Sequence, residues 1–246
     1  MKILFWNLGY SRGIDGSLQQ YAKYFYRIFA HSRLSQQMTL TSIGKTIQEI
    51  NPDIFLGAEV STGSLKNGFF NHHCHLGDFL GYDTRHAQSK YDSKILAQLP
   101  FHKGNTNTVL SLEPVLIEAI HLQTGLKTLV YKINTEKYTI LFVHLNLRSR
   151  QRRKQLEELA EIIKHITGPV ILCGDMNIFG GVIELEPLIN ATGMRLAHET
   201  MYTFPSHKPK MALDVCLVRG MSDASIQVTT RQSSMSDHVP VIVEIA

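Results

Sequence analysis

Short apolar runs bounded by turn residues recur along the whole 246-residue chain, and this pattern constrains the fold more than any other feature. Runs of this length predict buried strands. The predicted strands cover residues 3–8, 53–58, 94–99, 109–112, 115–120, 128–133, 139–144 and 170–173 and, near the C-terminus, 212–218, 225–230 and 239–245. Apolar residues recur at helical spacing over 18–29, 39–50 and 150–166, which predicts three helices.

This order of elements favours an α/β fold in which two packed sheets carry helices on their outer faces. The length allows one large domain or two small ones. Because no Pro/Gly/Ser-rich linker interrupts the chain, we expect a single domain over residues 1–246. The three cysteines, Cys74, Cys173 and Cys216, exclude a disulfide framework and favour a reducing, cytoplasmic location. No apolar run has the length of a membrane helix, so we expect no integral membrane association.

Polar residues of a few types stand at or near the ends of these predicted strands: Asn7, Glu59, His144, Asp175, Asn177, Asp214, Asp237 and His238. Any one of them alone is more typical of a turn or a cap. Together they indicate a cleft, because strand ends are where a sheet presents side chains to a ligand. Four carboxylates in one cleft repel one another unless a divalent cation lies among them, and hard oxygen ligands suit Mg²⁺ or Mn²⁺.

Short motifs surround these residues in a fixed order along the chain. They are Phe5-Trp6-Asn7, Ala58-Glu59-Val60, Asn107-Thr108-Val109-Leu110-Ser111, Val143-His144-Leu145, Cys173-Gly174-Asp175-Met176-Asn177, Thr203-Phe204-Pro205, Leu213-Asp214-Val215 and Ser236-Asp237-His238-Val239-Pro240. In these motifs the sequence resembles the endonuclease/exonuclease/phosphatase superfamily, which includes deoxyribonucleases, abasic-site endonucleases, neutral sphingomyelinases and inositol-polyphosphate 5-phosphatases. The resemblance implies a four-layer α-β-β-α sandwich with two mainly antiparallel sheets and a site between their edges.

The resemblance also implies which residues hold a metal ion. Glu59 would be the principal Mg²⁺ ligand, and Asn7 and Asp237 would lie beside the ion, directly or through water. A phosphate ester repels nucleophiles, so a bound cation would polarise the phosphorus centre or stabilise the leaving oxygen.

A second group of motif residues would carry the chemistry. Asp175 would orient and deprotonate the attacking water, and Asn177 would hold that water or a phosphate oxygen. Asp214 would pair with His238, which would donate to a non-bridging phosphate oxygen as charge develops there. His144 matches the deoxyribonuclease, sphingomyelinase and phosphatase branches, whereas abasic-site enzymes carry a tyrosine at this position.

Candidate substrate contacts come from three further places. Arg148 and Arg150 open a basic run that ends at residue 154; a solvated helix face explains this run as well, although cations in a first turn oppose the helix dipole. Asn107 lies in a motif strand, and Arg85, His86 and Lys90 are further candidates for binding substrate phosphate. We interpret the histidines at 72, 73 and 75 as surface or cleft-rim residues, with 73 and 75 on one face of a strand.

Residues 10–37 look like a helical insertion relative to compact members of the family. Its aromatic residues, Tyr21, Tyr24, Phe25 and Phe29, are expected to pack as core, and the alternative is a lid or ligand-facing helix beside Asn7.

The sequence therefore predicts a Mg²⁺-dependent hydrolase of phosphate esters, with Mn²⁺ as a substitute ion. The preferred substrate is a phosphodiester such as nucleic acid. The alternative is a phosphomonoester of a sugar, inositol or lipid head group, and a non-catalytic binding module is a third reading. A bilayer substrate is less favoured because no extended apolar hairpin is evident. The net charge of +4 permits an anionic partner without requiring one, and the oligomeric state stays open.

Overall fold

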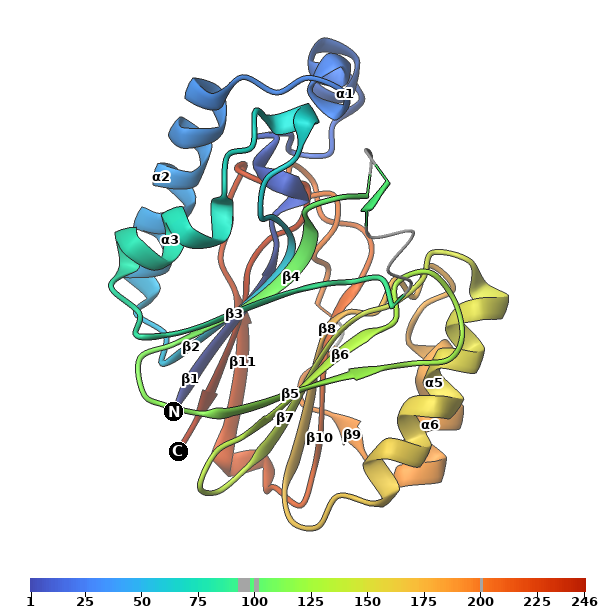
Figure 1. Ribbon diagram of the computed structural model, residues 1–246. Helices are drawn as coiled ribbons and strands as arrows, with labels where there is room; N and C mark the ends of the chain where they lie inside the picture. Colours follow the sequence, from blue (N-terminus) through green and yellow to red (C-terminus); the bar gives the residue numbers. More distant parts are fainter. Residues whose placement is uncertain (93–97, 100–101, 200) are drawn as a thin grey trace.

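Two six-stranded sheets pack face to face in the computed structural model, which describes residues 1–92, 98–99, 102–199 and 201–246 (Figure 1). The first sheet has the order β11 (Ile226–Thr230), β12 (Val241–Ile245), β1 (Lys2–Asn7), β2 (Ile54–Ser61), β4 (Asn105–Ser111), β3 (Thr84–Ser89). The second has the order β5 (Leu116–His121), β6 (Leu129–Asn134), β7 (Thr139–His144), β8 (Val170–Asp175), β10 (Asp214–Arg219), β9 (Arg195–Leu196). Among the strands that the structure describes, only β1–β2 and β7–β8 pair in parallel, so the predicted mainly antiparallel sandwich is confirmed.

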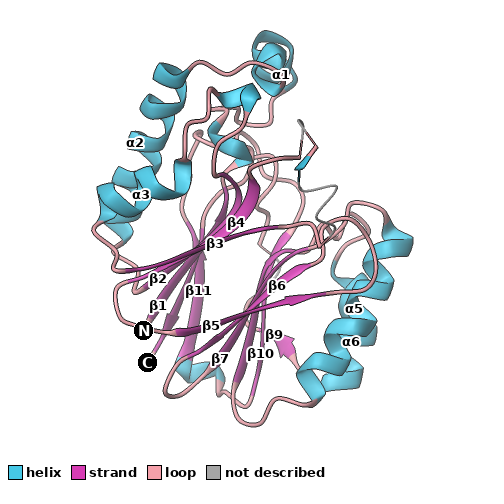
Figure 2. Cartoon of the chain, viewed as in Figure 1, coloured by secondary structure: helices cyan, strands magenta, loops and turns pink. Residues whose placement is uncertain are grey.

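Helices cover the outer face of each sheet (Figure 2). Helices α2 (Arg33–Ile50) and α3 (His72–Leu80) lie against the first sheet, and α5 (Ser149–Lys164) and α6 (Glu186–Thr192) lie against the second. Helix α1 (Leu18–Tyr24) stands beyond the ends of the strands. Single 3-10 turns occur at Gly9–Ser11, Phe25–Ile28, Leu65–Asn67, Val182–Leu185 and Asp223–Ser225. None of the helices among the described residues is both long and apolar enough to cross a membrane.

The sheets are buried on both faces, which explains why their central strands read as continuous apolar runs. In β1, Ile3 and Phe5 join the core between the sheets, whereas Leu4 and Trp6 pack with the helices of the first outer layer. The same alternation runs through β8, where Cys173 faces the other sheet. A side chain two residues beyond the last core residue of such a strand therefore points into the inter-sheet layer.

Most predicted elements are found within a few residues of their expected bounds. The helix expected at 39–50 starts at Arg33, because the Ser32 hydroxyl accepts a hydrogen bond from the Ser35 amide and caps it. Sequence patterns did not predict α3, α6, β3 or β9. The histidines at 72, 73 and 75 lie in the first turn of α3 and not on a strand, and the expectation that they are surface or cleft-rim residues is wrong for His72, which is buried. The strand predicted at 94–99 falls mainly on 93–97, outside the described residues.

The expectation that the aromatic residues of 18–29 pack as core is wrong. No residue of α1 or of the following 3-10 turn is buried, and Phe25 and Phe29 are 58% and 53% exposed. The physical reason is position: the segment lies past the strand ends, where no sheet face is available to cover it (Figure 1). The alternative, a helix beside the predicted site, agrees better with a hydrogen bond of 2.6 Å from the Tyr21 hydroxyl to Asp237.

His72 is a buried histidine that is held in its neutral form. Its Nε2 lies 2.6 Å from Oε1 of Gln36, and its Nδ1 lies 3.4 Å from the Ser11 hydroxyl. The amide nitrogen of Gln36 donates to two backbone carbonyls, so its oxygen faces the ring and accepts the Nε2 proton. Burial lowers the pKa of His72 to about 3.

We predict that acid destabilises the fold through His72. The pKa of His72 is lower in the folded protein than in an unfolded chain. Its contribution to the free energy of unfolding is therefore fully present above about pH 6.5 and is lost as the pH falls toward 3. Between about pH 6.5 and 5 this group alone should lower the free energy of unfolding by about 2 kcal/mol. Urea unfolding at the two pH values measures the change, and an unaltered pH dependence in His72→Gln would contradict the assignment.

Candidate active site

Residues predicted as one site do meet at one end of the inter-sheet layer. Asn7 ends β1, His144 ends β7 and Asp175 ends β8, while Asp214 begins the antiparallel β10. The register places His144 beside Asp175 and Asp175 beside Asp214. All four residues are at most 4% exposed. Each continues the alternation that puts its strand's apolar residues between the sheets, so a single geometric rule brings them together.

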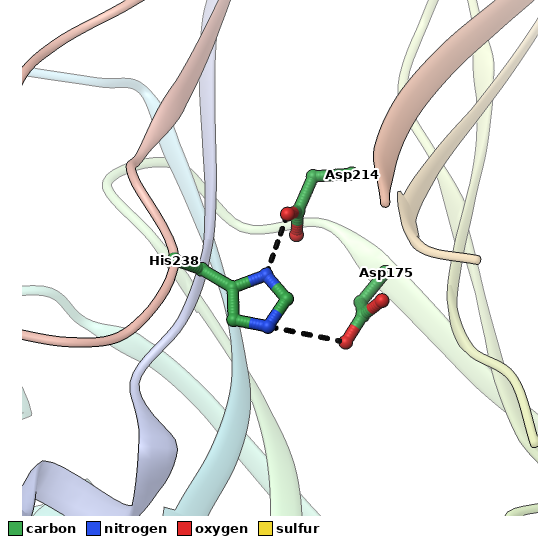
Figure 3. Close-up of side chains that lie close together, drawn as sticks. All are labelled: Asp175, Asp214 and His238. Carbon is green, nitrogen blue, oxygen red and sulfur yellow. Dashed lines mark hydrogen bonds and ion pairs between the residues drawn. The ribbon is translucent and has the colours of Figure 1, made fainter. Parts of the chain in front are cut away.

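His238 is held between two carboxylates (Figure 3). Its Nδ1 lies 2.6 Å from Oδ2 of Asp214, and its Nε2 lies 3.9 Å from Oδ2 of Asp175. Burial lowers the pKa of His238, but the charges of Asp214 and Asp175 outweigh it and raise that pKa to about 10. Potential ligand atoms of these three residues lie within 4.8 Å of one another. An imidazolium has no free lone pair, so we interpret the group as an ion-paired cluster rather than a metal site.

Asp175 is a carboxylate with a raised proton affinity. Its oxygens accept hydrogen bonds from Nδ2 of Asn7 at 2.9 Å and from the backbone amide of Asn177 at 3.1 Å. Burial raises the pKa of Asp175 to about 6, although His238 acts in the opposite direction. Asn177 adopts a positive φ of 52°, and its side-chain amide donates to the Leu145 carbonyl. Asp175 can thus accept a proton near neutral pH from a fixed position.

Glu59 faces buried cations. It interrupts the β2–β4 register with a φ of 53°. Its Oε1 lies 3.4 Å from Nζ of Lys90 and 4.0 Å from both Nζ of Lys127 and Nε2 of His144. Burial raises the pKa of Glu59, but Lys90 and Lys127 dominate and hold it well below its usual range. Glu59 is therefore ionised, and its charge is compensated within the protein.

Two lysines and two tyrosines complete the surroundings of the predicted residues. Lys127, which the sequence analysis did not identify, forms a short contact with Nε2 of His144, and burial lowers the pKa of Lys127 to about 8. Lys90 was only a weak candidate, and its Nζ donates to the Tyr10 hydroxyl at 2.5 Å. Tyr21 reaches the site through its hydroxyl, as described above. Tyr21 belongs to the aromatic residues at helical spacing, whereas no sequence motif marks Tyr10 or Lys127, which lie in turns outside the strands.

The asparagine and the three arginines predicted to contact substrate differ in position. Asn107 is buried, and its Oδ1 has no hydrogen-bond partner among the described residues. Arg148 lines a surface hollow together with Lys127, next to the site, whereas Arg150 lines a different hollow beside Phe179. Arg85 is not brought to the group. It packs on α3 at the outer face of the first sheet, where its guanidinium binds Asp78 and the Tyr82 carbonyl.

The basic run at 148–154 contains one structural arginine. Arg152 is 1% exposed, and its guanidinium makes a bidentate pair with Glu184 at 2.6–2.9 Å. It also donates to the carbonyls of Asn146 and Leu147 and so holds the loop that follows β7. This residue therefore belongs neither to a solvated helix face nor to a phosphate-binding surface.

We predict that Arg152→Gln lowers the free energy of unfolding by about 3–5 kcal/mol, because it leaves Glu184 and two carbonyls without their partner. Arg153→Gln, one position along the same helix, removes an exposed charge and should change stability by less than about 0.5 kcal/mol. Urea unfolding of both variants provides the comparison. Equal effects would show that the buried pair contributes little.

Comparison with known proteins identifies the family of the chain and supports its fold. Residues 4–238 match the Endonuclease/Exonuclease/phosphatase family, and the chain belongs to this family of phosphoesterases. The predicted resemblance is thereby confirmed. No curated protein sequence matches the chain.

Solved structures with the same fold cover the entire chain at low sequence identity. Sphingomyelinase C from Streptomyces griseocarneus has 16% identity, a TM-score of 0.70 and 99% of its own chain covered. A family protein from Leptotrichia buccalis has 18% identity, a TM-score of 0.64 and 99% covered. TDP2 from Caenorhabditis elegans has 16% identity, a TM-score of 0.62 and 74% covered. Identities this low establish the shared fold alone.

Proposed function

We propose that this phosphoesterase is a divalent-cation-dependent phosphodiesterase, with nucleic acid among its candidate substrates. The observation that carries the proposal is the buried pair formed by Asp175 and His238, 3.9 Å apart. One member accepts a proton near neutral pH and the other stays protonated. A base and a cationic donor in this proximity are what in-line attack by water on phosphorus requires.

His238 would bind and neutralise a non-bridging phosphate oxygen through Nε2. Its Nδ1 is engaged by Asp214, which fixes the ring orientation and favours the imidazolium. As negative charge grows on the phosphate, this hydrogen bond strengthens and lowers the barrier. Asp175, oriented by Asn7 and by the Asn177 amide, would position water and take its proton.

The donor chemistry of the first sheet suits Mg²⁺, or Mn²⁺ in its place. Glu59, Asn7 and Asp237 would hold the ion through carboxylate and amide oxygens, which hard cations prefer. A bound dication would polarise the phosphate and stabilise the leaving oxygen. The ammonium groups of Lys90 and Lys127 compete for the same Glu59 carboxylate.

We predict that Asp175→Asn and His238→Ala each lower the turnover of bis-p-nitrophenyl phosphate by about a hundredfold or more while the protein remains folded. Asp223→Asn and His165→Ala alter exposed residues of the same types and serve as controls with full turnover. The assay is release of nitrophenolate with Mg²⁺ present, and circular dichroism checks folding. Full turnover in either active-site variant would refute the assignment.

Other substrates, tested with Mg²⁺ present, separate the proposal from its alternatives. Cleavage of the diester but not of p-nitrophenyl phosphate supports a phosphodiesterase, and nicking of plasmid DNA narrows it to a nuclease. Release of inorganic phosphate from inositol phosphates would instead identify a phosphomonoesterase. Tight binding without turnover of any of these would indicate a binding module.

We predict that Mn²⁺ uptake depends on Glu59 and is opposed by Lys127. Calorimetry should show binding to the native protein, loss of binding in Glu59→Gln, and affinity raised by about tenfold in Lys127→Met, since a positive charge 4.0 Å from the carboxylate is removed. Lys154→Met, an exposed lysine on α5, should change nothing. The absence of Mn²⁺ and Mg²⁺ uptake by the native protein would rule out the metal requirement.

A further inference from the structure

The end of the molecule that holds the site exposes much apolar surface. Of the sixteen large apolar side chains that are exposed among the described residues, eight belong to the segments 18–38 and 65–69. We call six of them, all more than half exposed, the apical patch: Phe25, Tyr26, Phe29, Leu34, Leu65 and Phe69. Apolar surface gathered in this way marks an interaction site more often than scattered residues do.

Hydrogen bonds join the two segments that carry the apical patch. The backbone amide of His31 donates to the Lys66 carbonyl at 2.9 Å, and the side-chain amide of Gln36 donates to the Asn67 carbonyl at 3.1 Å. In Figure 1, α1 and the turn that precedes α3 lie at the same end of the molecule. The two segments that carry the apical patch are therefore held together at this end of the molecule.

The chain around the apical patch carries charge of one sign. Residues 16–48 contain four lysines and arginines and no aspartate or glutamate, and residues 60–77 contain no acid either. Lys23 and Arg33 are exposed, and Arg27 stacks on Tyr24 with 3.8 Å between the guanidinium carbon and the ring centre. Aromatic and aliphatic residues mixed with cations, and free of carboxylates, are typical of surfaces that bind anionic lipids.

The apical patch is also linked to the site. Tyr21, on the helix that leads into the patch, donates a hydrogen bond of 2.6 Å to Asp237. Arg27 donates to the backbone carbonyl of Arg12, whose charge in turn acts on Glu59. A partner surface bound to the apical patch would thus lie near Asp237 and the surroundings of Glu59.

We propose that the apical patch docks the protein onto a bilayer that contains anionic lipids. The rings of Phe25, Tyr26 and Phe29 enter the boundary between head groups and acyl chains, and Lys23 and Arg33 contact lipid phosphates. The docking is peripheral and needs no membrane-spanning helix. The expectation that a bilayer substrate is less favoured rested on the lack of an apolar hairpin, and here the exposed aromatic segment supplies the apolar surface instead.

Co-sedimentation with vesicles tests the proposal. The native protein should bind vesicles of phosphatidylcholine mixed with phosphatidylglycerol and bind phosphatidylcholine alone weakly, and added salt should reduce the binding. Phe25→Ser/Phe29→Ser should weaken it by about tenfold or more. Lys23→Gln/Arg33→Gln should weaken binding to the anionic vesicles by about tenfold and leave binding to phosphatidylcholine unchanged.

Matched variants elsewhere on the surface provide the controls. Leu116→Ser on β5 and Lys154→Gln on α5 remove an exposed apolar residue and an exposed charge, and both should bind like the native protein. Equal binding by native protein and Phe25→Ser/Phe29→Ser would overturn the proposal. So would a concentration-dependent dimer that the same double substitution abolishes in sedimentation equilibrium, because a second copy would then cover the patch.

Docking and hydrolysis fail separately in these measurements. No residue of the apical patch belongs to the catalytic group, so Phe25→Ser/Phe29→Ser should hydrolyse bis-p-nitrophenyl phosphate at the native rate. Vesicle binding without diester hydrolysis would remove the proposed function and leave the docking intact. Hydrolysis without vesicle binding would refute the docking and leave the proposed function intact.

Discussion

Charge compensation inside the inter-sheet layer is the constraint on which the site depends. Glu59, Asp175 and Asp214 lie where water is largely excluded, and a buried carboxylate is costly unless a cation or donor faces it. His238 meets the two aspartates, and a pair of lysines meets Glu59. The result is two neighbouring ion clusters, one around Asp175 and Asp214 and one around Glu59, and Nε2 of His144 lies between them, 3.4 Å from Asp175 and 4.0 Å from Glu59.

This division gives the two halves of the site different chemistry. In the second sheet, the pKa of Asp175 is raised to about 6, because the effect of its burial is only partly offset by His238. Around Glu59 two lysines face one acid, so Glu59 stays ionised. Proton transfer is therefore suited to Asp175, and binding of a cation or of an anionic substrate is suited to the surroundings of Glu59.

The sequence predicted those parts of the site that follow from strand periodicity. Asn7, His144 and Asp175 each end a continuous apolar run, so their positions at strand ends were predictable, whereas the face that each side chain takes was not, because these strands are apolar on both faces. Lys127 was not predictable, because it lies in the turn before β6, outside any periodic run, and reaches His144 at the end of the neighbouring strand β7. Arg85 shows the opposite limit: it lies on a strand of the correct sheet, but on the face that α3 covers.

The aromatic segment 18–29 was misjudged for a related reason. The helical spacing of Tyr21 and Phe25 predicts an apolar helix face, but it does not indicate whether another part of the chain packs against that face. In the folded chain the segment stands past the strand ends, where Tyr21 donates to Asp237 and Arg27 donates to the Arg12 carbonyl. The rest of its apolar surface then has to face outward. The same geometry that leaves Phe25 and Phe29 exposed thus ties the preceding helix, α1, to Asp237 of the candidate metal site. The surface that the two phenylalanines form lies at the same end of the molecule as the site.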